Sequence, residues 1–199
     1  MGARSGGNGM GGGDSNYVGN ITEVESLKNI QDRKLYNEMK SAISRYYKTL
    51  GIPQKEVGLA DLEDAYGVHI TQNGKSAAIY LDKKIFKTGT VESITAKKTA
   101  DYKSGWATKT NKPVAHTLTH ELAHATWNSA LTSPKAVAAG KQIGKLFTTW
   151  KGDRRKTGYG RYAKSNVNEF WAETITKGIH GQSDKYTKAA LSIARKYKL

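Results

Sequence analysis

The run His120-Glu121-Leu122-Ala123-His124 constrains this chain more than any other stretch. On an α-helix with 3.6 residues per turn, His120 and His124 lie one turn apart on the same face, so their imidazoles can hold one zinc ion. Glu121 lies about 100° round the helix from His120, where its carboxylate can act as general base toward a metal-bound water. The run therefore predicts a helix that carries two metal ligands. Any further ligand must come from another part of the fold.

Composition narrows the chemistry open to such a site. The 199 residues contain no cysteine, which excludes disulfides, thiolate zinc ligands and cysteine nucleophiles. With 37% apolar residues and four Trp, the chain can bury a core, most simply as one domain. No apolar stretch approaches the ~18 residues that span a bilayer, and the N-terminus lacks the apolar core of a signal peptide. We expect a soluble protein with no membrane span that is not exported by the general route.

The net charge of +15 falls in the second half of the chain. Residues 1–82 contain nine Lys and Arg against ten Asp and Glu, whereas residues 83–199 contain 23 against seven. A basic surface of this kind suits a polyanionic partner such as DNA, RNA, an anionic membrane face or an acidic protein. A solvated surface that lysine keeps soluble would have the same composition.

The first third of the chain is predicted to be scaffold. Residues 1–20 are rich in glycine, and we interpret them as a flexible arm or linker, with residues 21–199 forming the single folded domain. Apolar residues recur at helical spacing from residue 23 to about residue 48. A shorter helix is predicted over about residues 54–66, where Gly67 stops it.

The pattern then changes toward period two, and the turn signal Asn73-Gly74 predicts a β-hairpin over residues 68–86. Within it, residues 77–81 are our candidate for an edge strand along which an extended peptide would pair, although a purely structural hairpin would have the same pattern. Residues 87–111 are rich in Thr, Lys, Ser and Gly, and we predict a loop-rich segment beside the site.

The metal helix is predicted over about residues 113–128. Its back, opposite the histidines, is apolar and should face the core through Val114, Leu118, Leu122 and Ala125. Three histidines follow one another on its front, an arrangement that would be costly to bury without a ligand. His116 pairs with His120 at the same spacing, but only the His120 and His124 pair has a glutamate directly after its first member. We therefore place His116 beside the ligands or in the wall of the site.

A catalytic zinc site usually has three protein ligands, so a third must come from elsewhere. If residues 166–179 are helical, Glu169 and Glu173 lie one turn apart on one face, and two such carboxylates repel unless a positive charge lies beside them. A zinc ion would be that charge, with Glu169 as third ligand and Glu173 orienting a ligand imidazole. The alternative is a solvated acidic stripe. His180 is a weaker competitor for the third ligand position.

Two more helices are predicted, over about residues 134–150 with Ser133 as the cap, and over residues 183–198. The expected fold class is therefore α+β. A small, mostly antiparallel sheet should lie beside the metal helix, and helices should form the C-terminal half.

Glu169 follows His124 by 45 residues. The combination of the histidine run with Glu169 and Glu173 resembles zinc metallopeptidases whose third ligand is glutamate. It is most similar to the catalytic domain of anthrax lethal factor and to related peptidase-like domains of toxins and bacteriophage head proteins. The resemblance covers residues 68–180 and implies a zincin-like fold with one catalytic zinc ion. In that family a tyrosine seven residues before the glutamate ligand helps to stabilise the tetrahedral intermediate, and the matching position here is Tyr162.

The expected activity is zinc-dependent hydrolysis of peptide bonds in a protein or peptide substrate. Glu121 would take the proton of a zinc-activated water, and Tyr162 would share the oxyanion with the zinc ion. Two alternatives stay open. One is a basic structural protein of a virion or nucleic-acid assembly that retains the metallopeptidase-like fold and binds DNA through residues 83–199. The other is a toxin or effector protease with one specific substrate. We expect a cytoplasmic or virion-associated location.

Overall fold

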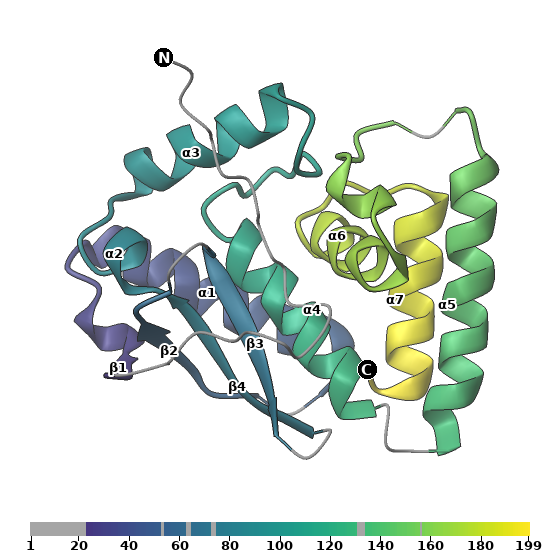
Figure 1. The fold of residues 1–199 in the computed structure, drawn as a ribbon, viewed down its shortest axis with the longest axis horizontal. Coiled ribbons are helices and arrows are strands. Elements are labelled where there is room, and N and C mark those ends of the chain that lie inside the picture. The colour runs from purple at the N-terminus through teal and green to yellow at the C-terminus, as the bar shows by residue number, and fades with distance from the viewer. Residues whose placement is uncertain (1–22, 53, 63–64, 73–74, 131–133, 156) are drawn as a thin grey trace.

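The structure, a computed structural model, describes residues 23–52, 54–62, 65–72, 75–130, 134–155 and 157–199. The predicted glycine-rich arm lies outside these residues. The described chain is α+β, as predicted, with one small sheet and a majority of helices (Figure 1). No helix in these ranges combines the length and the apolar character that crossing a membrane requires.

The sheet is mixed, with two antiparallel pairings and one parallel pairing. Its strands lie in the order β1-β2-β4-β3, and β2 pairs parallel with β4 while the two outer pairs are antiparallel. The strands are β1 (Glu25–Ser26), β2 (Val57–Ala60), β3 (Gly67–Gln72) and β4 (Lys75–Asp82). The sequence does not predict the parallel pair, because its pattern favours a helix over the residues that form β2.

The predicted helix over residues 54–66 is wrong. Its residues Val57–Ala60 form β2, in register with residues 79–82 of β4. Leu59 and Ala60 are fully buried, and a short buried apolar run has no periodicity that separates a strand from a helix. Pairing with β4, whose partner residues lie 22 positions further along the chain, makes this segment a strand.

The predicted hairpin is confirmed by β3 and β4, with Gly67 opposite Leu81 and Gln72 opposite Lys75; the turn residues 73–74 lie outside the described ranges. The prediction that residues 77–81 form an edge is wrong for residues 79–81, because these lie between β2 and β3. At this side of the sheet the edge strand is β3.

The first helix begins later than predicted, because residues 25–29 form β1 and the 3₁₀ turn η1 (Leu27–Asn29). α1 (Arg33–Leu50) begins after Asp32, whose carboxylate accepts hydrogen bonds from the first free backbone N–H groups of the helix. It ends at Gly51, whose φ of 69° is left-handed and favours glycine.

The predicted loop over residues 87–111 contains a helix, α3 (Val91–Lys103), which follows the short α2 (Lys83–Phe86). A capping box formed by Thr90 and Ser93 begins it. Within α3 only Ile94 and Lys98 are buried. Because few of its side chains reach the core, α3 has no clear apolar periodicity. The sequence pattern therefore does not predict this helix.

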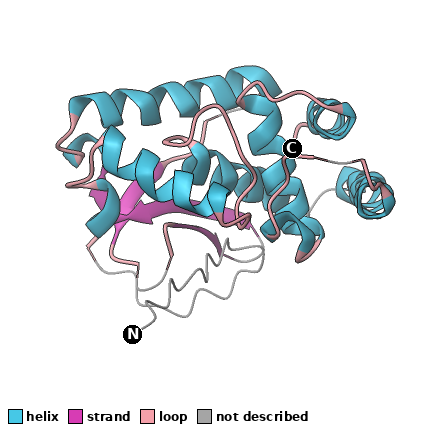
Figure 2. Cartoon of the chain, turned by 90° about the horizontal axis from the view of Figure 1, so that it is seen from above, coloured by secondary structure: helices cyan, strands magenta, loops and turns pink. Residues whose placement is uncertain are grey.

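The remaining helices agree with the predictions within a few residues. They are α4 (His116–Ala130), α5 (Pro134–Gly152), α6 (Val167–Ile179) and α7 (Lys185–Tyr197), with the 3₁₀ turn η2 (Tyr162–Lys164) before α6. α4 packs against β3 and β4, and α6 lies between α4 and the neighbouring pair α5 and α7 (Figure 1). Helices cover one face of the sheet (Figure 2).

Three buried contacts fix the position of α4. The Trp171 indole N–H on α6 donates to the Ala123 carbonyl at 3.3 Å, and the Trp171 ring packs against Trp127 at 6.0 Å. On the other side of α4, the hydroxyls of Tyr46 and Thr126 lie 2.6 Å apart. Aromatic side chains bury large areas, so the Trp171 contacts fix the position of α6 along α4. This position sets the geometry of the site between the two helices.

Candidate metal centre

The site is formed where the front of α4 meets α6. As predicted, the back of α4 is core, since Leu118, Leu122 and Ala125 have no exposed surface. The front is also buried, with His120 and His124 at 4% and 0% exposure. Buried imidazoles need hydrogen-bond or charge partners, and α6 supplies carboxylates.

Three atoms from the two helices form a close triangle. His120 Nε2 and His124 Nε2 lie 3.1 Å apart, and Glu169 Oε2 lies 3.0 Å from the first and 3.3 Å from the second. Zinc bonds of about 2.0–2.2 Å in tetrahedral geometry separate neighbouring ligand atoms by about 3.4 Å. The triangle therefore matches the ligand face of one zinc ion, and the predicted ligands His120, His124 and Glu169 are brought together as a group that could hold a metal.

The charges of the triangle call for a cation. Burial alone would lower the pKa of His120, but the Glu169 and Glu173 carboxylates raise it to about 10. Burial likewise would raise the pKa of Glu169, but His120 and His124 lower it to about 2. Two facing Nε2 atoms also repel when both carry lone pairs. A proton on His120 can supply the positive charge, and so can a zinc ion bound by all three side chains; the donor set fits zinc.

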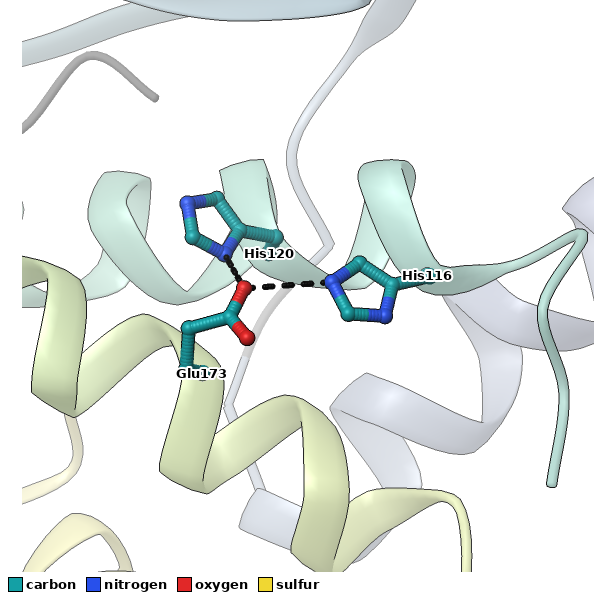
Figure 3. Close-up of side chains that lie close together, drawn as sticks. All are labelled: His116, His120 and Glu173. Carbon is teal, nitrogen blue, oxygen red and sulfur yellow. Dashed lines mark hydrogen bonds and ion pairs between the residues drawn. The ribbon is translucent and has the colours of Figure 1, made fainter. Parts of the chain in front are cut away.

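Glu173 contacts the His120 imidazole on the side away from the triangle. Its Oε1 lies 3.0 Å from His120 Nδ1 and 3.1 Å from His116 Nε2 (Figure 3). Its Oε2 accepts a hydrogen bond of 2.7 Å from the backbone N–H of Thr108. Burial opposes ionisation, but His116 and His120 hold the pKa of Glu173 well below its usual range. A carboxylate at Nδ1 keeps a proton there and leaves Nε2 of His120 to face the triangle.

His116 belongs to this outer layer. Its Nδ1 lies 3.2 Å from the Tyr102 hydroxyl, which is also 3.0 Å from the Thr110 hydroxyl. His116, His120 and Glu173 are close enough to hold a metal themselves. A metal in this second group would need Nδ1 of His120, whereas the triangle uses Nε2. Glu173 Oε1 already lies within hydrogen-bond distance of both ring nitrogens that face it, His120 Nδ1 and His116 Nε2. The hydrogen-bond pattern therefore favours a chain from Tyr102 through His116 to Glu173.

Glu121 faces the site from the side of the sheet. It is 2% exposed, and its Oε2 has no hydrogen-bond partner among the described residues. Burial raises the pKa of Glu121, against the opposing charges of His120 and His124. A Cβ atom added to Gly67, at the start of β3, would lie 3.0 Å from Glu121 Cγ. The absence of a side chain at Gly67 therefore lets β3 pass close to Glu121. A raised pKa makes the carboxylate a better proton acceptor.

Tyr162 lies on the other side of His120. The two rings stack with centroids 5.6 Å apart and an interplanar angle of 24°. Trp106 stacks in turn on Tyr162 at 5.5 Å, and the Arg161 guanidinium lies over Trp106 at 5.9 Å. Tyr162 and Trp106 are only partly buried, so this ladder joins the buried centre to the protein surface.

The ladder depends on two loops that pair through their backbones. The N–H groups of Arg161 and Tyr162 donate to the carbonyls of Gly105 and Trp106 at 2.8 and 3.0 Å. The Gly160 N–H donates to the Thr108 hydroxyl at 3.1 Å. Thr108 therefore ties the Tyr162 loop to Glu173. The sequence did not predict roles for Trp106, Thr108 or Tyr102, and only the isolated tryptophan in a polar segment could have drawn attention.

Gly160→Ala is expected to lower the free energy of unfolding by about 3 kcal/mol. The two paired loops leave no space for an added methyl group and would have to move apart. A Cβ atom at Gly160 would lie 2.2 Å from the Trp106 carbonyl oxygen. Gly144 in α5 is the control, since a Cβ there meets nothing within 4 Å and Gly144→Ala should stabilise by about 0.5–1 kcal/mol. Urea unfolding measures both. Equal stability of the two variants would contradict this account of the loop pair.

Two other histidines lie outside the triangle. His180 Nε2 is 2.9 Å from the Thr119 hydroxyl, and His180 belongs to neither group of potential metal ligands found among the described residues. The structure therefore does not place it as a competitor for the third ligand. His69 on β3 is buried near His124, and burial, with the nearby His124, lowers the pKa of His69 to about 3.

Comparisons of the chain with protein-family models, with curated proteins and with solved structures found no match.

Proposed function

We propose that this protein is a zinc-dependent peptidase. One observation carries the proposal: His120, His124 and Glu169 bring three ligand atoms within 3.0–3.3 Å of one another, directly beside a buried glutamate without a hydrogen-bond partner among the described residues. Most buried polar side chains in proteins have a hydrogen-bond partner. Glu121 is instead left available, as a group that must exchange a proton would be.

The chemistry follows from the positions of the side chains. Zinc, when bound, polarises a carbonyl and lowers the pKa of a water molecule toward neutrality. Glu121 accepts a proton and passes it to the leaving amine, a role that its raised pKa supports. Tyr162, whose ring stacks on that of His120, would donate a hydrogen bond to an oxyanion that develops in the transition state. Glu173 keeps the His120 ring in place throughout.

The sheet offers a place for an extended peptide. β3 is an edge strand of the sheet and packs against α4. Gly67, at the start of β3, lies so close to Glu121 that an added Cβ atom would be 3.0 Å from Glu121 Cγ. A peptide that adds to the outer side of β3 would have its backbone fixed by main-chain hydrogen bonds. We propose β3, in place of the segment 77–81, as the strand along which substrate pairs.

Metal removal tests the proposed activity. The full chain, loaded with zinc, is incubated with a random peptide library, and new termini are identified by mass spectrometry. We expect cleavage that falls at least about 100-fold after chelation and returns when zinc is restored, since both water activation and oxyanion stabilisation are lost with the metal. Cleavage that survives chelation would contradict the proposal, and so would a protein that holds one zinc ion per chain and cleaves nothing in the library.

A further inference from the structure

The positive charge of the chain is concentrated at its C-terminal end. Residues 134–199 contain 15 Lys and Arg but only four Asp and Glu, so 66 residues carry +11 of the net +15. Glu169 and Glu173, two of the four acids, are buried in the metal centre. Asp153 is held by Lys185 at 2.6 Å, and Asp184 by Lys177 at 2.7 Å. No acid of this segment is left to neutralise its other cations.

Most of the exposed cations lie on, or directly after, two neighbouring helices. α5 and α7 run antiparallel, because Gln142 bonds to Tyr197 at one end of the pair and Asp153 bonds to Lys185 at the other. We define the α5–α7 face by the exposed basic residues of this region: Lys135, Lys141, Lys145, Lys151, Arg154, Arg155, Lys185, Lys188, Arg195, Lys196 and Lys198. Among the described residues, Lys141, Lys145 and Lys188 make no ion pair.

The chemistry of the face favours a nucleic acid over a membrane. An amphipathic helix that binds a bilayer inserts large apolar side chains, but Val137 is the one large hydrophobic residue strongly exposed among the described part of residues 134–199. Lysine ammonium groups are point charges that suit phosphate oxygens and carry no base-specific geometry. α5 has 19 residues and is therefore about 28 Å long, which matches roughly eight base pairs of duplex.

The face is separate from the metal centre. α6 lies between α4 and the α5 and α7 pair, with its two glutamates turned toward α4 (Figure 1). We infer that the α5–α7 face binds the phosphate backbone of nucleic acid without sequence preference, while the metal centre stays open to a second partner. The inference is independent of the proposed peptidase activity, because it concerns a different surface and is tested by binding alone.

The test is fluorescence anisotropy with a labelled 20-base-pair DNA of arbitrary sequence. If about four phosphates are neutralised, affinity should fall roughly 100-fold between 50 and 200 mM NaCl. The triple variant Lys141→Glu, Lys145→Glu and Lys188→Glu should weaken binding at 50 mM salt at least about 20-fold and flatten the salt dependence. The control is Lys34→Glu, Lys40→Glu and Lys48→Glu on α1, exposed lysines with the same total charge change, which should weaken binding less than about 3-fold.

Circular dichroism checks that each variant is folded, and glutamine versions of the same triples repeat the comparison with a smaller charge change. Absence of DNA binding at 50 mM salt would overturn the inference. Equal losses in the two triples would also overturn it, because net charge rather than this face would then explain the binding. Tighter association with phosphatidylserine vesicles than with the DNA would assign the face to a membrane instead.

Discussion

Glu121→Gln is expected to keep its zinc and to lose about 1000-fold in kcat/KM for peptide cleavage. The substitution retains the size of the side chain, which packs closely against Gly67, but removes the group that accepts the proton. General acid and base groups typically contribute 10²- to 10⁴-fold to an enzymatic rate, roughly, and this glutamate is proposed to serve in both capacities. The loss should lie mainly in kcat, because Glu121 does not belong to the ligand triangle.

The measurement pairs zinc content with initial cleavage rates on a peptide identified from the library. Glu92→Gln is the matched control, since it makes the same chemical change at an exposed position in the first turn of α3 and should leave both quantities unchanged. A Glu121→Gln protein that holds zinc and cleaves at the wild-type rate would exclude Glu121 as the base. A variant that loses its zinc would show that Glu121 supports the ligands instead.

Helical periodicity explains why so much of the centre could be predicted. The spacing of His120 and His124, and of Glu169 and Glu173, places each pair on one face of its helix whatever the rest of the fold does. Both helices form, and their faces meet. The expected role of Tyr162 follows from the family resemblance, and its stacking on His120 is a contact that no local pattern encodes.

The parts that were missed depend on contacts between distant segments. β2 is a strand because it pairs with β4, and that pairing also turns residues 79–81 from an expected edge into the interior of the sheet. Thr108 matters because its backbone N–H donates to Glu173, 65 residues away on α6, and its hydroxyl accepts from Gly160, 52 residues away in a second loop. Backbone pairing between loops leaves no periodicity in the sequence.

Glu169→Ala is expected to weaken zinc binding by at least about 100-fold. Outer-layer partners of zinc ligands cost 10- to 100-fold in affinity when removed, roughly, so a direct ligand should reach or exceed the upper end of that range. The substitution also removes the carboxylate that balances the two imidazoles, which would then face each other at 3.1 Å without an anionic partner in the triangle. Glu56→Ala, at an exposed position before β2, is the control and should bind zinc as the wild type does.

The central claim is that one zinc ion is held by His120, His124 and Glu169. Zinc per chain, measured by plasma mass spectrometry after dialysis against a weak chelator, tests it most directly in the wild type and in Glu169→Ala. The predicted result is about one zinc ion per chain in the wild type and less than about a tenth of that in the variant. Full zinc occupancy in Glu169→Ala, or a wild-type protein that retains no zinc, would contradict the claim.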